Sequence, residues 1–578
     1  MRKIVNPQQT QLFDPFDRVL TEQTRKRLLD GWPGVFRHII LELLPVEAVS
    51  VHFDATQGRP TRELYSVAGL LLIKEFMNWT KQHTLDAYSF NINVHYALNL
   101  EPVAHDLSMR TLERYIALFE EDEIAKTIMS QVTVELIKLL DIKIDKQRLD
   151  STHIFSDMAS FGRTRLMGAT VKRFLTQVLR HDEKAYNALD ETLRQRYTPS
   201  IHQLFGDIQK DGDSRRLLRQ QVAEDMVALV KLFADNASHN GRETYKALVR
   251  LFYEQCDVQE DKVTVKAKTG GNVMQNPSDP DATYDGHKGP GYQAQIAETC
   301  HPDNEVQLIT AALPQTAVES DTAALPIVLD ELAKSELLPE QLLVDTLYAG
   351  DENVQRAQEK GVELVGPVGG GSGKTQDAVY ERLNSDDFNV DETTEEVLRC
   401  PAGYTPQSSV HDKQIGTTKT VMPVAACSRC DYAEQCPVKK TAVGYQLEHT
   451  AKGRRLEGRR REQDTDVFKE RYKTRGGIES TNSGLKRRTG LGQLRVRGAP
   501  AVFHAIYLKL AGWNILRAAA CAKMRKIVHE RAAAAVFSLL ATVASIKIAA
   551  QTAYRSAKRR IVTCGSKIEN CPKLSTAA

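Results

Sequence analysis

The sequence lacks a hydrophobic run long enough to cross a membrane. Its most apolar stretch, AAAAVFSLLATVASI at 532–546, is about 15 residues long and ends at Lys547, whereas a spanning helix needs about 20 residues. The first residues, MRKIVNPQQTQLFDPFD, contain no apolar segment of the kind found in secretory signals. These absences predict a cytoplasmic protein, in which the apolar run is a packed, alanine-rich helix.

Cysteine is scarce and the net charge is small. Nine cysteines in 578 residues do not suggest a disulfide framework. A net charge of +3 does not by itself favour or exclude any class of binding partner. The charge is unevenly distributed, because residues 452–497 hold fifteen Lys and Arg against six Asp and Glu, which makes this segment +9 and the rest about −6. Clustered positive charge is typical of proteins that bind a phosphate backbone. A solvated basic surface would have the same composition.

Hydrophobic periodicity divides the chain into helical and strand-like segments. Helical spacing dominates residues 1–140, where Ser108 is a predicted N-cap, and returns at 157–256. DIKIDKQRLDSTHI has the alternation of a strand from residue 142 onward, with Asp150 near its end. Within 257–368, EQLLVDTLYAG, DENVQRAQEKG and VELVGPV follow one another as strand, helix and strand, which predicts parallel pairing. Asp345 lies at the carboxyl end of its strand, where open α/β sheets place their sites.

The motif GGGSGKT at 369–375 is similar to part of a phosphate-binding P-loop. That loop needs a glycine five residues before Gly373, and the residue at this position is Val368. The geometry that cradles phosphates is therefore not encoded. We predict a flexible loop here and no nucleotide hydrolysis.

Four cysteines cluster in the Pro-, Gly- and Asp-rich segment 369–450. A Cys-x2-Cys pair with two further thiols could close a tetrahedral Zn²⁺ site, whose ligands would be Cys400, Cys427, Cys430 and Cys436. The outer spacings of 26 and 5 residues are looser than those of standard zinc knuckles. Reduced, partly buried thiols are therefore the alternative. A structural zinc would stabilise a segment that is otherwise poor in core-forming residues.

The stretch YKTRGGIESTNSGLKRRTG, residues 472–490, places one acid among several bases. At 100° per residue its helix would present an acid, two bases and a phenol within an arc of about 60°; these are Tyr472, Arg475, Glu479 and Lys486. Gly476 and Gly477 each cost a helix about 1 kcal/mol relative to alanine, so the first turn could be irregular. A lone acid in this setting fits a metal ligand beside a polyanion, and it also fits a solvated helix face.

The spacing Tyr-x2-Arg-x3-Glu-x6-Lys resembles that of the DDE transposases of bacterial insertion sequences. RLDSTHI around Asp150 is similar to the first acidic motif of this family, and LLVDTLYAGDEN around Asp345 is similar to the second. The resemblance spans roughly residues 60–515. It implies a ribonuclease H-like core, with both aspartates on adjacent strands and Glu479 on a following helix. His153 is interpreted as a structural histidine beside this site.

The family resemblance implies metal-dependent cleavage of element ends and strand transfer to target DNA. Three converging carboxylates, Asp150, Asp345 and Glu479, would hold Mg²⁺, for which Mn²⁺ substitutes, and neutralise charge on the attacking and leaving oxygens. The expected partners are double-stranded DNA, at the element ends and the target, and further copies of the chain in a homodimer or larger assembly. The expected location is the bacterial cytoplasm, with the nucleoid and away from membranes. The expected DNA-binding residues are Tyr472, Arg475, Lys486, Arg487 and Arg488.

The predicted fold class is α/β, with a mixed sheet flanked by helices as the catalytic core. The predicted order is an N-terminal helical domain that binds DNA ends (1–140), the first core strand with the first Asp (141–156), a helical insertion (157–256), core with the second Asp (257–368), a loop-rich insertion with the four clustered cysteines (369–450), core with the Glu helix and basic segment (451–522) and a C-terminal helical tail (523–578). Two other functions remain open: a non-catalytic DNA-binding or regulatory protein on the same scaffold, and a nuclease that only hydrolyses.

Overall fold

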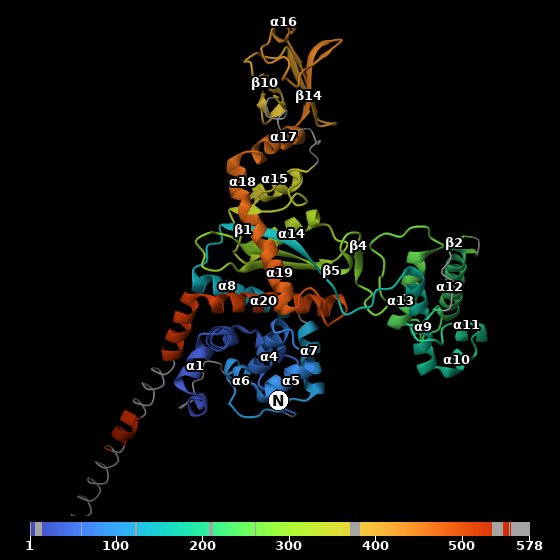
Figure 1. Cartoon of the computed structure of the whole chain (residues 1–578), viewed down its shortest axis with the longest axis vertical. Helices are drawn as coiled ribbons and strands as arrows, with labels where there is room; N and C mark the ends of the chain where they lie inside the picture. The colour runs from blue at the N-terminus through green and yellow to red at the C-terminus, as the bar shows by residue number, and fades with distance from the viewer. Residues whose placement is uncertain are drawn as a thin grey trace, which may run out of the picture. The chain divides into compact units, whose positions relative to one another are not determined.

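The protein is described by a computed structural model that covers residues 2–5, 14–58, 60–121, 124–206, 212–259, 262–369, 382–534, 547–553 and 555. The chain divides into two compact units, one of residues 1–140 with 511–578 and one of residues 141–510 (Figure 1). Most of the GGGSGKT motif and of the apolar run at 532–546 lies outside the described residues, so neither interpretation is tested. In the part of the chain that the structure describes, no helix is long and apolar enough to cross a membrane.

The first unit is helical, as its periodicity predicts. Its main helices are α1 (Glu22–Leu29), α2 (Trp32–Val35), α3 (Val46–Ser50), α4 (Leu64–Phe76), α5 (Lys81–Phe90), α6 (Ile92–Ala97), α7 (Met109–Glu121), α8 (Ile124–Leu140) and the second half of α20 (Ala499–Ala520). The predicted cap of α7 is confirmed, because the Ser108 Oγ accepts a hydrogen bond from the Thr111 amide at 3.2 Å. Gly512 lets α20 approach α4, since a Cβ there would lie 2.0 Å from the Phe76 Cβ.

A six-stranded mixed sheet is the centre of the second unit. Its strands are β1 (Lys146–Ile154), β4 (Thr283–Asp285), β5 (Gly289–Thr299), β6 (Ile309–Thr316), β7 (Gln341–Leu343) and β8 (Glu363–Val365), in the order β4-β5-β1-β7-β8 with β6 also paired to β5. β1 is antiparallel to β5 and parallel to β7, and β7 is parallel to β8. The predicted parallel pairing of 341–365 is therefore confirmed.

One strand boundary differs from the prediction. Ile142 and Ile144 precede β1, because pairing with β7 begins only at residue 146 and pairing with β5 only at residue 147. Asp150 consequently lies in the middle of its strand, opposite Ile296 of β5, and not near the strand end.

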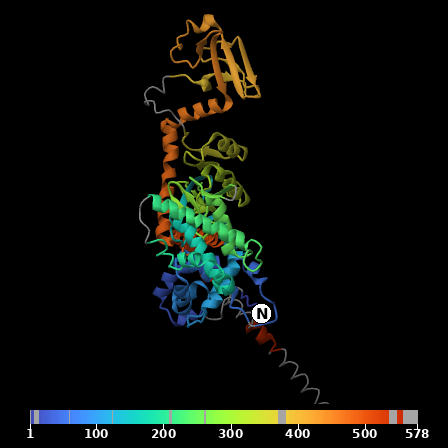
Figure 2. The same cartoon turned by 90° about the vertical axis from the view of Figure 1, so that its right-hand side faces the viewer.

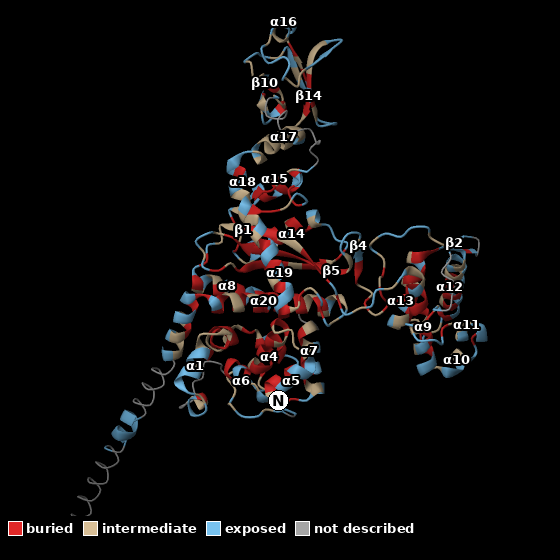
Figure 3. Cartoon of the chain, in the orientation of Figure 1, coloured by how far each residue is buried: buried red, intermediate tan, exposed pale blue. Residues whose placement is uncertain are grey.

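Helices cover the sheet and bury its central strands. α14 (Asp321–Lys334) contacts β5 and β6, α15 (Asp351–Glu359) contacts β8, and α19 (Gly477–Thr489) contacts β1. α18 (Asp466–Tyr472) and a 3-10 turn, η6 (Lys473–Gly476), lead into α19. β1 and β5 are red along most of their length in Figure 3, which shows that both strands are largely buried.

The helices predicted at 157–256 gather into one bundle (Figure 1). They are α9 (Arg163–His181), α10 (Glu183–Asn187), α11 (Glu191–Arg196), α12 (Gly212–Phe233) and α13 (Glu243–Gln255), followed by the hairpin of β2 (Cys256–Gln259) and β3 (Lys262–Val265). They enclose their own hydrophobic core, which includes Phe174, Met226 and Phe252.

The Cys-rich segment contains more regular structure than its sequence suggests. Two small sheets form from β9 (Asn389–Val390) with β10 (Val397–Arg399), and from β11 (Ser408–Asp412), β12 (Thr417–Met422), β13 (Lys439–Thr441) and β14 (Gly444–Thr450). They are the orange and yellow strands of Figure 2. β11 and β13 bury few side chains, which explains the weak hydrophobic period from which a loop-rich segment is predicted. α16 (Val424–Cys427) and α17 (Ala451–Gln463) complete the segment.

Candidate active site

The structure brings Asp150, Asp345 and Glu479 around one guanidinium group. The Arg475 Nη2 lies 3.0 Å from the Asp150 Oδ1 and 4.0 Å from the Asp345 Oδ2. The Arg475 Nη1 lies 3.4 Å from the Glu479 Oε1. These acids come from β1, from the turn after β7 and from the first turn of α19. Three carboxylates that are far apart in the sequence therefore share one cationic partner.

The three acids differ in exposure. Their side chains are 16%, 32% and 71% exposed for Asp150, Asp345 and Glu479 respectively. Burial raises the pKa of Asp150, the Arg475 charge opposes this shift, and the negative charges of Asp345 and Asp321 add to it. Repulsion between partly desolvated carboxylates would be relieved by a bound cation.

The donor set suits a hard divalent cation. Carboxylate oxygens are the ligands that Mg²⁺ prefers. In this structure the Arg475 guanidinium lies between the carboxylates and supplies the positive charge. Within the described residues, no three or more His, Cys, Asp or Glu side chains already form a group that could hold a metal ion. Arg475 would therefore have to turn away before the three carboxylates close on a metal.

Arg148 on β1 fixes the turn that carries Arg475. Its Nε donates to the Glu298 Oε2 at 2.8 Å, and its Nη1 donates to the Thr474 carbonyl at 2.8 Å. Thr481 of α19 donates to the other Glu298 oxygen at 2.8 Å. A buried ion pair thus ties α19 and the preceding turn to β1 and β5, and so sets where Arg475 reaches.

Gly477 is required by this packing. A Cβ at Gly477 would lie 2.0 Å from the Arg148 Nη1, whereas a Cβ at Gly476 would meet nothing within 4 Å. The irregular first turn that the glycine pair predicts is confirmed, because η6 precedes α19. Glycine at position 477 weakens the helix, but it leaves the space that the Arg148 guanidinium occupies.

Asp345 and Tyr472 also have structural contacts. The Asp345 Oδ1 accepts a hydrogen bond from the Leu347 amide at 2.9 Å, so this residue forms a turn as well as facing Arg475. The Tyr472 hydroxyl donates to the Val344 carbonyl at 3.1 Å, and its ring stacks on Phe468. Tyr472, which the resemblance assigns to DNA binding, thus bridges α18 to the residue beside Asp345.

Sequence reasoning missed Asn482. Its Nδ2 donates to the Asp150 Oδ2 at 3.3 Å, so it helps to orient the first acid. Asn482 lies three residues after Glu479, on the same helix face. That spacing is a signal that could have identified it.

A polar network behind the acids was also missed. The Ser151 Oγ donates to the Asp321 Oδ2 at 3.2 Å, and the Gln295 Nε2 donates to the Asp321 Oδ1 at 2.8 Å. The buried Tyr348 hydroxyl donates to the Gln295 Oε1. These contacts connect β1, β5 and α14 to the turn that holds Asp345. No sequence motif marks these residues, because each is an ordinary polar side chain until the strands are paired.

The basic residues of 452–497 fall into two groups. Lys486, Arg487 and Arg488 are exposed on α19. The arginines of α17 instead form contacts inside the protein: Arg455 bonds Asp351 at 2.8 Å and Arg461 bonds Asp387 at 2.7 Å. The local charge of +9 therefore overstates what is available to an external polyanion.

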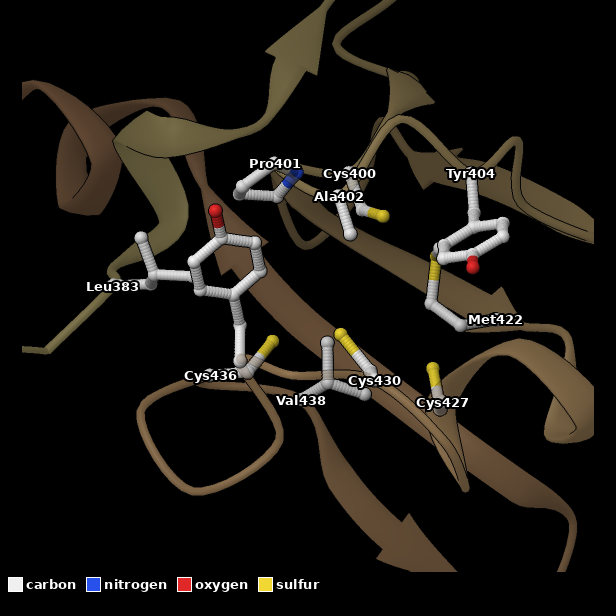
Figure 4. Close-up of a pocket in the computed structure, with 11 residues that line it drawn as sticks. Leu383, Cys400, Pro401, Ala402, Tyr404, Met422, Cys427, Cys430, Cys436 and Val438 are labelled. Atoms are coloured by element: carbon white, nitrogen blue, oxygen red, sulfur yellow. The ribbon is translucent and has the colours of Figure 1, made fainter.

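The four cysteines line one pocket (Figure 4). Leu383, Tyr404, Met422 and Val438 also line this pocket, which makes its surroundings apolar. Burial raises the pKa of the Cys427 thiol, and the other three cysteines raise it further. Four sulfur donors in one pocket match the ligand preference of Zn²⁺, although they do not form a ready-made ligand group in the described structure.

Comparison with known proteins supports the class that the acidic motifs resemble, the DDE transposases. Residues 399–519 match a family model described as a transposase DDE domain. The matched segment contains Glu479 and the four cysteines but neither aspartate, and it is a minority of the chain. It supports a DDE transposase, and Arg475 within it bonds Asp150 outside it.

Two further comparisons add little. No curated protein matches the sequence. A cryo-EM structure of a piggyBac transposase synaptic complex with hairpin DNA aligns over 74% of this chain and 80% of that chain, at 10% identity and a TM-score of 0.21. A similarity this low supports no conclusion about fold or function.

Proposed function

We propose that the protein is a DDE transposase that cuts the ends of its own insertion sequence and joins them to target DNA. The observation that carries the proposal is the gathering of Asp150, Asp345 and Glu479 around Arg475. The transposase DDE family match over 399–519 supports it independently. The mixed sheet, with β1 and β7 adjacent, fits the ribonuclease H-like core that such an enzyme requires.

The three carboxylates would hold Mg²⁺, or Mn²⁺ in its place. When bound, these ions supply charge neutralisation at the attacking and leaving oxygens of the phosphodiester. The protein's own residues position this site. Asn482 orients Asp150, and Arg148 holds the turn before α19.

Exposed lysine and arginine side chains on α19 would contact the DNA backbone. Lys486, Arg487 and Arg488 lie on the helix that carries Glu479, so phosphate contacts there would place the strand beside the acids. The N-terminal helices would recognise the element ends. Because two ends must be brought together, the active form would be a homodimer or larger assembly on double-stranded DNA.

The Cys pocket would hold a structural zinc. Cys400, Cys427, Cys430 and Cys436 supply four sulfur donors, and a cation would offset the burial and the neighbouring thiols that raise the pKa of Cys427. The hydrophobic cluster beside the pocket is small, consisting of Phe388, Val397 and Leu447 with partly buried neighbours. A zinc would add the stabilisation that so small a core lacks.

The test is the reaction of labelled element-end DNA and a target plasmid with purified protein and Mg²⁺ or Mn²⁺. We expect cleaved ends and joined products from the wild type, and neither product from Glu479→Gln. The matched control is Glu470→Gln, since Glu470 is another exposed glutamate that pairs with a nearby base, Lys473. Loss of a surface ion pair costs at most about 1 kcal/mol of stability, so the control should remain active.

The products also separate the alternatives. Cleavage without joined product would identify a nuclease that only hydrolyses. DNA binding without any cleavage would identify a non-catalytic DNA-binding protein. Full activity in Glu479→Gln would remove this residue from the catalytic set.

A further inference from the structure

Lys288 is held beside Ser151, the residue that follows the first acid, by a well-defined turn. It lies between β4 and β5, where the Asp285 Oδ1 accepts hydrogen bonds from the His287 and Lys288 amides at 2.8 and 2.6 Å. Gly289, with φ of +98°, completes the turn. The Lys288 Nζ donates to the Ser151 Oγ at 3.2 Å. Its ammonium group thus reaches the residue that follows Asp150.

Lys486 brings a second positive charge to the same place from α19. Its side chain lies against Gly492, where a Cβ would be 3.2 Å from the Lys486 Cγ. Lys486 is exposed overall, but partial desolvation of its side chain lowers its pKa, the positive charge of Lys288 lowers this pKa further, and Asp150 opposes both. Lys486 is therefore within electrostatic reach of both Lys288 and Asp150. In the described part of the chain, neither one forms an ion pair.

His153 is an unusual buried neighbour of these lysines. Its side chain is 8% exposed, and neither ring nitrogen has a hydrogen bond of good geometry. Burial lowers the pKa of His153, with Lys288 and Lys486 contributing, while the nearby Pro290 carbonyl and Asp285 oppose the shift. Buried polar atoms are normally hydrogen-bonded. Apart from this weak contact with the Pro290 carbonyl, the ring has no hydrogen-bond partner among the described residues, and the two lysines beside it would attract an anion.

We propose that Lys288 and Lys486, with His153 beside them, form a subsite for one DNA backbone phosphate next to Asp150. This inference rests on the proposed function, and it adds Lys288 and His153 to the substrate-binding residues. Like charges held close together repel, and a phosphate between them converts that repulsion into attraction. A lysine contacts phosphate as a point charge, so the subsite would position a strand of any sequence.

The test is the salt dependence of binding to a 30-base-pair DNA duplex of arbitrary sequence in EDTA, so that no reaction occurs. Each lost phosphate contact reduces the slope of log K against log salt by about 0.9. We expect this reduction in Lys288→Gln and a wild-type slope in Lys288→Arg, which keeps the charge. Ser151→Ala, which removes only the hydroxyl that Lys288 bonds, should also keep the slope.

The matched control is Lys334→Gln, because Lys334 is an exposed lysine at the end of α14 that pairs with Glu331. It should leave the slope unchanged. If the wild type binds DNA and Lys288→Gln keeps the full slope, the subsite is wrong and the proposed function stands. If the wild type shows no salt-dependent binding, the proposed function itself is wrong.

Discussion

Arg475 and Asp150 are joined by a hydrogen bond of 3.0 Å between the Arg475 Nη2 and the Asp150 Oδ1. The two residues are 325 positions apart in the sequence. Their contact connects the turn before α19 to the middle of β1. The family resemblance assigns Arg475 to binding a DNA phosphate, but in this structure Arg475 contacts the predicted metal ligands. Arg475 and a divalent cation would compete for the same carboxylates.

Arg475→Ala should increase the affinity of the protein for Mn²⁺. The variant removes a positive charge that faces three acids, and the pair with the exposed Glu479 alone contributes up to about 1 kcal/mol. We therefore expect the dissociation constant to fall by about fivefold. A titration followed by the electron paramagnetic resonance of free Mn²⁺ measures it. Lys473→Ala is the control, because Lys473 pairs with Glu470 and not with the predicted ligands. Equal affinity in wild type and Arg475→Ala would show that Arg475 does not compete.

Gly477→Ala should destabilise the protein by about 1–3 kcal/mol, the usual cost of overpacking. The new Cβ would lie 2.0 Å from the Arg148 Nη1 and would disturb the buried pair with Glu298. Gly476→Ala is a closely matched control, because its Cβ meets nothing within 4 Å and its φ of −57° suits alanine. That variant should be neutral or slightly stabilising. Urea denaturation measures both, and equal stability of the two variants would contradict the Arg148 contact.

Asp150→Asn should raise the melting temperature of the EDTA-treated protein at pH 7. In the separate assay with Mg²⁺, the same variant should not cleave DNA. Burial raises the pKa of Asp150 in the folded protein. A raised folded pKa contributes stability below the unfolded pKa, and this contribution is lost as pH rises through the folded pKa. The advantage of asparagine should therefore shrink as pH falls towards about 4. Asp466→Asn, at a fully exposed position, should have no such effect. A lower melting temperature for Asp150→Asn at pH 7 would show that Asp150 is net stabilising.

Purified protein should contain one zinc per chain. Cys427→Ser and Cys430→Ser should each remove it, because both thiols line the pocket with Cys400 and Cys436. Elemental analysis measures the metal. Cys256→Ser, a buried thiol next to α13 and outside the pocket, should keep it. Zinc-free wild-type protein with a normal melting curve would exclude the site.

The sequence by itself determined the local elements and the motif on α19. Helices such as α4 and α7 follow from hydrophobic period, and the irregular turn η6 follows from the glycine pair. The parallel pairing of β7 and β8 follows from the order strand, helix, strand. These features depend on hydrogen bonds and side-chain directions within a few residues, which a local pattern encodes. The candidate acids were found in the same way, from their place in short motifs.

Only the tertiary structure decided which of these residues meet. Strand order placed β1, which carries Asp150, beside β7, and packing of α19 on β1 brought Arg475, Asn482 and Lys486 to the acids. The same packing assigned the arginines of α17 to internal ion pairs and brought Lys288 next to Ser151. Such contacts join residues more than one hundred positions apart. They depend on pairing register and on side-chain packing between whole elements, for which a local sequence pattern contains no signal.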